Sequence, residues 1–394
     1  MHIELTDDQR ALQEELRRYF RDLVPPEQAR SMLVQRHGEL YRDVVKRMGR
    51  DGWLGVGWPT GYGGRGFGEV EQTIFVNEAS RRDVPLPYVT LQTVGPVLQA
   101  YGTQEQKDFF LPRILAGDLH FAIGYTEPDA GTDLANLRTS AVRSREGDHY
   151  VVNGQKVFTT GGHDADYVWL AARTDPDAAR HGKKHSGISI LIVDTRDPGF
   201  SWTPTITADG AHHINTTYYA DVRVPVSMRV GEENEGWRLI TTQLNHERVM
   251  LGPAGRIAGL YERVREWAAR PGADARRPAD EPDVARALAE THAICRINEL
   301  LNWQVASRSA DEVAVADASA TKVFASERAQ RVFRLLEEVV GRHGDPADEQ
   351  TGELLHWLDV QAKRSLVLTF GGGVNEVQRE LIATFGLGLP RVPR

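Results

Sequence analysis

The spacing of apolar residues divides the chain into three stretches. Residues 1–119 repeat apolar positions at helical spacing, and Thr6 is the expected N-cap of the first helix. The inward face of that helix is predicted to hold Leu12, Leu16, Tyr19 and Leu23. Over residues 120–230 the period changes to two, and over residues 231–394 helical spacing returns. We therefore predict an α-helical N-terminal domain, a β-barrel or sandwich middle domain and a C-terminal α-helical domain.

The middle stretch contains short β-rich runs separated by turns. The runs cover residues 149–159, 167–171, 188–193 and 216–224. No helical pattern separates them, which favours an antiparallel barrel or sandwich over a Rossmann domain. Asn153-Gly154 inside the first run is a hairpin signal.

Two irregular segments interrupt the helical regions. Residues 270–282 are polar and rich in proline, and we expect an exposed connector between long helices. Residues 55–68 are dense in glycine, but no strand precedes them and no Gly-Lys-Ser/Thr ends them. A tight surface turn is therefore favoured over a phosphate-binding loop.

Composition excludes several classes of protein. The 55 acidic and 47 basic residues give a net charge of −8 with both signs interspersed, so nucleic acid is not an expected partner. Cys295, the single cysteine, is expected to be a buried small apolar residue. His212 and His213 lack partners at metal-ligand spacing, and no metal is assigned. No membrane span or signal peptide is expected, so the predicted location is cytoplasmic.

Two polar segments in the β region carry groups suited to cofactor binding. Residues 125–133 read Tyr-Thr-Glu-Pro-Asp-Ala-Gly-Thr-Asp, and residues 157–162 read Val-Phe-Thr-Thr-Gly-Gly. Singly, each is an ordinary polar loop. Together they offer hydroxyl and backbone N–H donors to the edge of a flavin ring, and Phe158 could lie against the face of the ring.

These segments resemble the acyl-CoA dehydrogenase family, and the similarity runs through essentially the whole chain. The family carries Thr-Glu-Pro-x-Ala-Gly-Ser/Thr-Asp and later Gln-Lys-x-Trp-x-Thr, matched here by residues 126–133 and 155–160. The resemblance implies an α+β fold with an antiparallel β middle domain and a C-terminal four-helix bundle. It also implies FAD as cofactor, held between the β domain and the C-terminal domain.

Individual cofactor contacts follow from the same resemblance. Thr126 is expected at the pyrimidine end of the flavin, Thr132 at the pyrophosphate or the nearby CoA, and Thr160 opposite flavin N5. Phe158 replaces the usual tryptophan, which keeps the apolar face and removes the indole donor. The predicted cofactor-binding set is Ile123, Tyr125, Thr126, Thr132, Phe158 and Thr160.

Glu247 is the predicted catalytic base. Most of the family use a glutamate in a C-terminal Tyr-Glu-Gly-Thr segment, whereas the isovaleryl and long-chain branches place it on an earlier helix before an arginine. Here the C-terminal position is Gly372, and Glu247-Arg248 matches the alternative. The resemblance implies that Glu247 takes the α-proton while the β-hydrogen leaves as hydride to flavin N5. The backbone N–H of Gly372 and a ribityl hydroxyl then bind the thioester oxygen, and Arg248 supports the base.

A simpler interpretation of Glu247 is a solvated helix carboxylate paired with Arg248 or His246, which is the usual state of an isolated Glu-Arg pair on a helix. The surrounding family pattern favours the catalytic role. Pro253, shortly after, either kinks this helix and aims the base or starts a second helix.

The chain departs from homotetrameric members in two FAD-clamping segments. Neither the Arg-x-x-Phe-Gly segment nor the Gly-Gly-x-Gly turn is clear in residues 269–279 and 340–346. This combination is similar to the actinobacterial α2β2 acyl-CoA dehydrogenases of sterol side-chain degradation, whose Leu-Thr-Phe-Gly-Gly-Gly-x-Asn-Glu-Val-Gln-Arg segment matches residues 368–379. The resemblance implies a steroid acyl-CoA substrate and a paralogous partner subunit, with a homo-oligomer as the alternative. Electron-transferring flavoprotein is the expected electron acceptor.

Two other functions stay open from the sequence. The same fold could act as an oxidase or as a biosynthetic dehydrogenase on another acyl thioester. Alternatively, the chain could be a structural subunit whose partner carries the productive base, as the unclear clamp segments would allow.

Overall fold

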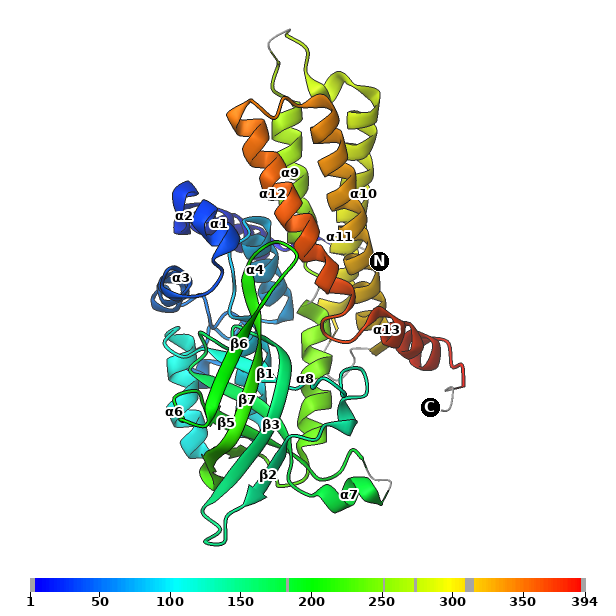
Figure 1. Cartoon of the computed structure of the whole chain (residues 1–394). Coiled ribbons are helices and arrows are strands. Elements are labelled where there is room, and N and C mark those ends of the chain that lie inside the picture. Colours follow the sequence, from blue (N-terminus) through cyan, green and yellow to red (C-terminus); the bar gives the residue numbers. More distant parts are fainter. Residues whose placement is uncertain (1–3, 182–183, 251, 273–274, 309–314, 391–394) are drawn as a thin grey trace. The chain divides into compact units, whose positions relative to one another are not determined.

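A computed structural model describes residues 4–181, 184–250, 252–272, 275–308 and 315–390 (Figure 1). The side chains of residues 179–180 and 244–250 also lie outside the description, so Glu247 and Arg248 are located by their backbone alone. The chain forms two compact units, each assembled from separate stretches of sequence. The first unit contains Met1–Leu33, Phe67–Pro85 and Arg248–Arg394, and the second contains Val34–Gly66 and Leu86–Glu247.

The first unit is helical. Its helices are α1 (Asp7–Leu23), most of α2 (Pro26–Val34), α4 (Glu69–Arg81), α9 (Ala254–Ala268), α10 (Pro282–Ala306), α11 (Val315–His343), α12 (Glu349–Ser365) and α13 (Asn375–Leu381). The predicted start of α1 is confirmed, because the Thr6 hydroxyl accepts from the Gln9 N–H at 3.2 Å and the Gln9 side chain accepts from the Thr6 N–H at 3.1 Å. Tyr19 is only half-buried, and Phe20 supplies the fourth buried position of this helix.

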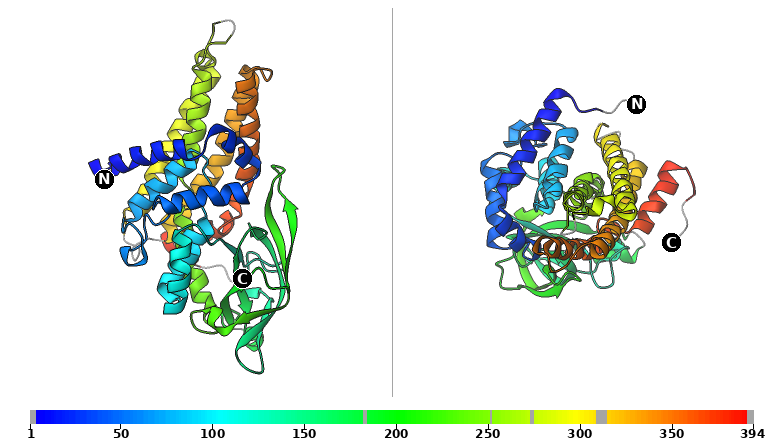
Figure 2. Two further views of the ribbon diagram at one scale, coloured as in Figure 1. Left: turned by 90° about the vertical axis from the view of Figure 1, so that its left-hand side faces the viewer. Right: turned by 90° about the horizontal axis from the view of Figure 1, so that it is seen from above.

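The long helices α9 to α12 form the predicted four-helix bundle (Figures 1 and 2). Their shared core includes Leu260, Val284, Phe333, Leu336 and Leu358. Within the same unit, α9 crosses α4 at Gly255 and Gly259. A Cβ at either glycine would lie about 2 Å from a carbonyl oxygen of α4, so only glycine permits this approach.

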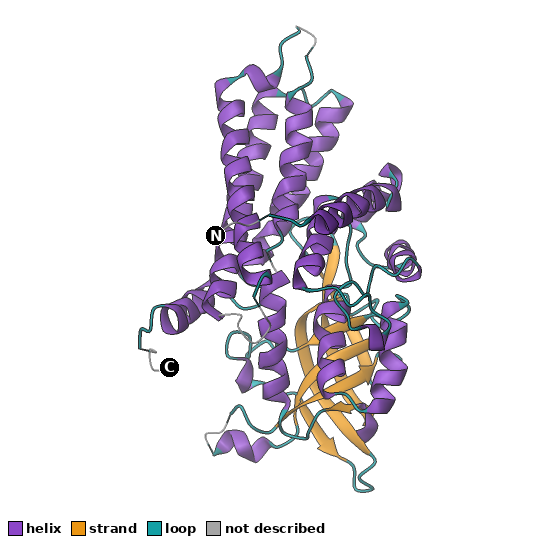
Figure 3. Cartoon of the chain, turned by 180° about the vertical axis from the view of Figure 1, so that it is seen from behind, coloured by secondary structure: helices purple, strands orange, loops and turns teal. Residues whose placement is uncertain are grey.

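The second unit contains the sheet (Figure 3). Its described strands are β1 (Phe121–Gly124), β2 (Ser140–Arg143), β3 (His149–Thr160), β4 (Tyr167–Arg173), β5 (Ile188–Asp194), β6 (Phe200–Ile206), β7 (His212–Pro225) and β8 (Arg229–Val230). They form one sheet in the order β6-β7-β3-β2-β4-β5-β8, with β1 paired to β4. Most pairs are antiparallel, as expected, but β1 and β2 each pair with β4 in parallel. The buried layer of side chains includes Tyr150, Val168, Leu191 and Val222.

Helices accompany the sheet in the second unit. They are α3 (Glu39–Arg50), α5 (Gly95–Tyr101), α6 (Gln104–Leu115), α7 (Pro176–Arg180) and most of α8 (Gly236–Met250). The glycine-dense loop that precedes α4 contains a short 3-10 turn, and a Cβ at Gly64 would meet the Trp58 backbone at 2.1 Å. Close packing of the loop on its own tryptophan therefore accounts for glycine at this position.

The hairpin predicted at Asn153-Gly154 is wrong. β3 continues through both residues, and its register against β7 shifts between Val152 and Gly154. Gly154 has φ 153°, and a Cβ there would lie 2.5 Å from Thr139 Oγ1. Val152 to Gly154 is two steps along β3, whereas the paired Val222 to Tyr219 is three steps along β7, so the extra residue of the bulge lies on β7. Asn153 and Gly154 therefore stay within one long strand, and pairing with β7 overrides the local turn preference.

The break predicted near Pro253 separates two helices. α8 ends at Met250, and α9 begins at Ala254 with Pro253 as its N-cap residue. The interpretation of Pro253 as a helix start is therefore correct. Of the helices that the structure describes, none is both long and apolar enough to cross a membrane.

Candidate functional site

The two polar segments that the sequence singled out lie side by side. The Val157 N–H donates to the Thr126 carbonyl at 2.8 Å. Immediately afterwards the register between β3 and β7 shifts, and Phe158 adopts φ 58°. This left-handed conformation is uncommon for a bulky residue, and Phe158 is 66% exposed. An exposed aromatic face beside Thr126 and the exposed Thr160 fits a planar cofactor such as a flavin ring.

Lys156 ties these segments together from inside the sheet. Its side chain is fully buried, and Nζ donates to the Tyr125 carbonyl at 3.0 Å and to Glu127 Oε1 at 2.8 Å. Glu127 also accepts from the backbone N–H groups of Arg138 and Thr139. Burial lowers the pKa of Lys156 to about 8, although the Glu127 carboxylate favours its charged form. The turn that carries Thr126 is therefore held by a buried ion pair.

A buried chain of hydrogen bonds connects the segment that contains Tyr125 and Thr126 to α8. Trp169 Nε1 donates to the Tyr125 hydroxyl at 3.1 Å, and that hydroxyl donates to Gln243 Oε1. Gln243 Nε2 is buried and has no partner among the described residues. Glu247 follows Gln243 by one helical turn on α8, so the two backbone positions share a helix face.

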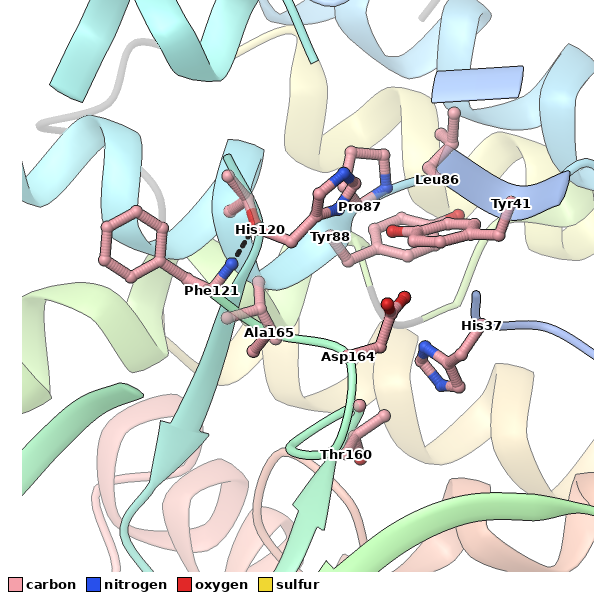
Figure 4. Close-up of a pocket in the computed structure, with 13 residues that line it drawn as sticks. His37, Tyr41, Leu86, Pro87, Tyr88, His120, Phe121, Thr160, Asp164 and Ala165 are labelled. Carbon is pink, nitrogen blue, oxygen red and sulfur yellow. Dashed lines mark hydrogen bonds between the residues drawn. The ribbon is translucent and has the colours of Figure 1, made fainter. Parts of the chain in front are cut away.

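A cavity of about 150 Å³ opens at the end of β3 (Figure 4). Thr160 ends β3, and Asp164 and Ala165 follow it, while His37 approaches from the segment before α3 and Tyr41 from the first turn of α3. Its other lining residues are Leu86, Pro87, Tyr88, Val89, Thr90, His120, Phe121 and Gly161. The predicted flavin-facing residue Thr160 thus lines a cavity whose wall mixes aromatic rings with aliphatic and polar residues.

Imidazole rings gather beside this cavity. His163 stacks on His212 with a centroid separation of 4.0 Å, and His37 meets His163 edge-on at 5.1 Å. Burial, with a smaller effect from neighbouring histidines, lowers the pKa of His37 to about 3, and burial lowers that of His120 to about 4. The imidazoles of His37 and His120 are therefore neutral at physiological pH. Among the residues that the structure describes, no three His, Cys, Asp or Glu side chains are grouped to hold a metal ion.

The backbone N–H of Gly372, which is predicted to donate to the thioester oxygen of the substrate, belongs to the other compact unit. Gly372 and Gly373 have φ 65° and 89°, in a turn between α12 and α13. Gln378 Nε2 donates to the Gly372 carbonyl at 3.3 Å, and Lys322 Nζ donates to the Gly373 carbonyl at 2.8 Å. Left-handed conformations at these two consecutive positions account for glycine at 372 and 373.

The other residues predicted to bind the cofactor or to act in catalysis lie outside the contacts described above. Ile123 lies in β1 and pairs with Trp169, and Thr132 is exposed in the loop after β1. The side chains of Glu247 and Arg248 lie outside the described residues. The roles assigned to all of these residues, and to Gly372, stay predictions.

Comparisons with known proteins agree with this arrangement. Family models of acyl-CoA dehydrogenase match the N-terminal domain over residues 6–118, the middle domain over 122–221 and the C-terminal domain over 234–387. Acyl-CoA dehydrogenase FadE29 of Mycobacterium tuberculosis is 67% identical over 394 residues, covering 100% of both chains. The chain belongs to the acyl-CoA dehydrogenase family.

Two solved structures are similar to the chain over their full length. The ChsE4-ChsE5 complex from Mycobacterium tuberculosis matches with a TM-score of 0.89 and 50% identity, covering 100% of each chain. A structure described as the Tcur3481-Tcur3483 steroid ACAD matches with a TM-score of 0.91 and 47% identity, again covering 100% of each chain. The acyl-CoA dehydrogenase fold predicted from the sequence is confirmed.

Sequence reasoning missed the buried polar residues that support the site. Lys156 has the same strand parity as the inward-facing Tyr150 and Val152, so the alternation could have revealed a buried lysine. Lys322 likewise shares a helix face with the buried Ala318 and Ala325. A charged residue at a core position of an amphipathic pattern is the signal that would have identified both.

Proposed function

We propose that the chain catalyses FAD-dependent α,β-dehydrogenation of an acyl-CoA thioester, giving a trans-2-enoyl-CoA. The observation that carries this proposal is the buried bond between Tyr125 and Gln243 of α8. Tyr125 adjoins Thr126, and Glu247 follows Gln243 by one helical turn. The predicted base and the predicted flavin edge therefore belong to neighbouring elements of one compact unit.

The residues along this edge suit the cofactor. FAD, when bound, accepts the hydride that leaves the β-carbon of the substrate. We assign Phe158 to the face of the flavin ring, Thr126 to its pyrimidine end and Thr160 to the neighbourhood of N5. Thr132 is assigned to the pyrophosphate or the nearby CoA. The uncommon backbone conformation of the exposed Phe158 supports this assignment.

The side chains and backbone of the protein must make it possible to remove the α-proton of the thioester, which is only weakly acidic. Hydrogen bonds that strengthen as negative charge develops on the thioester oxygen lower the barrier, and we assign one of them to the N–H of Gly372. Glu247 takes the α-proton, supported by Arg248. A carboxylate held away from water has a raised pKa, which improves the match to its task as a base near neutral pH.

We propose a bulky substrate, a steroid side-chain acyl-CoA. One solved relative is described as a steroid ACAD and is 47% identical over the whole chain. Glycine at position 372, where most of the family have glutamate, also removes a side chain from the neighbourhood of the substrate.

We further propose that a paralogous subunit completes the enzyme as an α2β2 heterotetramer. Both solved relatives are described by pairs of protein names, and the chain lacks clear FAD-clamping segments in residues 269–279 and 340–346. Electron-transferring flavoprotein is the acceptor we expect to reoxidise the flavin.

The test is the purification of the chain alone and together with a co-expressed paralogous subunit, followed by the flavin-to-protein ratio of each preparation. We expect flavin to be retained mainly by the complex. Anaerobic mixing with straight-chain and steroid side-chain acyl-CoA then compares the rates of flavin bleaching. Bleaching at least tenfold faster with the steroid thioester is expected, by roughly the discrimination that an apolar pocket supplies. Flavin-loaded complex that no acyl-CoA bleaches would overturn the function, and full occupancy of the chain alone would overturn the shared site.

A further inference from the structure

Lys322 of α11 is a buried cation outside the contacts assigned above to cofactor and base. It is 1% exposed, and its Nζ donates to the Gly373 carbonyl at 2.8 Å and to Asn375 Oδ1 at 2.7 Å. Burial lowers its pKa to about 8. A buried ammonium is costly unless its donors are used, and here the donors hold the glycine turn between α12 and α13.

That turn needs support from outside. Consecutive glycines at φ 65° and 89° have no Cβ to restrict them, so the direction of each peptide depends on its hydrogen bonds. Gln378 holds the Gly372 carbonyl, and Lys322 holds the Gly373 carbonyl. Asn375 Nδ2 donates to Ser326 Oγ at 3.0 Å, which fastens the start of α13 to α11. The two peptides that follow the N–H of Gly372 are therefore both fixed.

The same turn of α11 also packs against the chain that follows the base helix. A Cβ at Gly252 would lie 2.5 Å from Ala325 Cβ, so the backbone at Gly252 approaches α11 closely. Asn298 and Asn302 of α10 donate to the Gly252 carbonyl at 3.2 and 3.1 Å. One segment of α11 thus holds the glycine turn by hydrogen bonds and packs closely against the chain before α9, whose Gly252 carbonyl is held by α10.

We propose that Lys322 is a positioning residue for the dehydrogenation, because it fixes the direction in which Gly372 presents its N–H to the thioester oxygen. This inference rests on the proposed function. Lys322 acts through the peptide that it holds and does not bind the acyl group. Its two acceptors are uncharged oxygens, and charge-assisted hydrogen bonds of this kind are stronger than neutral ones.

The test compares Lys322→Met with Lys363→Met in the flavin-loaded complex. Lys363 lies exposed on α12 in a surface pair with Asp359, so the control makes the same substitution without touching the turn. The first readout is the carbonyl stretch of a bound enoyl-CoA labelled with ¹³C at the thioester carbon. The second is α-proton exchange of a bound 3-thia-acyl-CoA with deuterated water.

We expect wild type and Lys363→Met to lower the carbonyl frequency equally on binding. Lys322→Met should lower it less and slow exchange by about tenfold to a hundredfold, the effect of a small misplacement of a reacting group, with unchanged flavin content. An unchanged stretch and exchange rate in Lys322→Met would overturn the positioning role alone. No shift and no exchange in wild type would overturn the proposed function itself.

A second variant keeps the test decisive if Lys322→Met does not fold. Gln378→Met removes the bond to the Gly372 carbonyl while nearly preserving side-chain volume. The positioning account expects a smaller loss of carbonyl shift than in Lys322→Met, because this bond is longer and neutral. A full wild-type shift in Gln378→Met would contradict it.

Discussion

Lys156 and Lys322 are both buried lysines, yet they support two different kinds of structure. Lys156 lies inside the sheet and faces the Glu127 carboxylate, which also accepts from two backbone N–H groups. Lys322 lies in a helical bundle and donates to a backbone carbonyl and a side-chain amide. The ion pair of Lys156 and Glu127 stabilises the turn that carries Thr126, whereas the ammonium of Lys322 orients a glycine turn. A buried charge can thus serve either stability or direction, depending on what accepts its hydrogen bonds.

The largest expected effect that separates the two lysines is on stability. Lys156→Met leaves the Glu127 carboxylate buried without its cation, which costs roughly 3–5 kcal/mol of unfolding free energy. Lys322→Met leaves neutral acceptors and should cost about 1–3 kcal/mol. Urea unfolding of both variants measures the difference. Lys156→Met should also lose flavin, because the turn that carries Thr126 loosens, whereas Lys322→Met should keep it.

A double substitution provides the control for Lys156. Lys156→Met combined with Glu127→Leu removes both charges and should recover part of the lost stability, because a well-packed apolar pair can replace a buried ion pair. If the double variant is no more stable than Lys156→Met, then loss of packing rather than the unpaired carboxylate explains the effect.

An intermediate effect is expected at the glycine turn. Gly373→Ala places a Cβ on a residue at φ 89° and 2.6 Å from Gln378 Nε2, so that side chain must shift, whereas Gly388→Ala adds a Cβ at φ 67° in open space. Each should lose about 1–2 kcal/mol of stability through the left-handed backbone. Only Gly373→Ala should also slow α-proton exchange, because only Gly373 belongs to the turn that Lys322 holds. Equal rates of α-proton exchange in the two variants would show that the glycine turn does not affect removal of the α-proton.

The smallest expected effect is on the stability of the fold at acidic pH. Because the pKa of His37 is lowered to about 3, the unfolded chain binds more protons than the folded chain between that pH and about 6.5. Stability therefore falls as pH drops below about 6.5. His37→Gln removes this contribution and should move the acid-unfolding midpoint to lower pH. The exposed His356 of α12 offers a matched control. His356→Gln moving the midpoint equally would argue against the buried imidazole as the cause.

The sequence predicted elements well where one local pattern dominated. Thr6 as the N-cap of the first helix, the strands β3, β4, β5 and β7 and the long C-terminal helices follow from spacing and terminal residues, whereas β1, β2, β6 and β8 are not among the predicted runs. The prediction failed at Asn153-Gly154, because pairing with β7 outweighs the preference of two residues for a turn. Tertiary context also decides which polar residues are buried.

The candidate site shows the same division. The segments that contain Thr126 and Phe158 could be singled out from their residue types, and the family resemblance supplied their expected roles. Other contacts join residues that are far apart in sequence. Tyr125 bonds to Gln243, and Lys322 donates to the carbonyl of Gly373 in the glycine turn. No local pattern encodes such contacts, although a lysine at an inward position does indicate that a buried acceptor must exist.

The measurement that tests the central claim most directly is α-proton exchange in a Glu247→Gln variant. A 3-thia-acyl-CoA has sulfur at the β position, so it loses no β-hydride and reports the base alone. In deuterated water, flavin-loaded wild type should exchange the α-protons of this probe, as followed by mass spectrometry. Glu247→Gln should retain its flavin and exchange at least a hundredfold more slowly, in line with the contribution of a general base. Exchange at the wild-type rate in Glu247→Gln would show that another group removes the proton and would contradict the account.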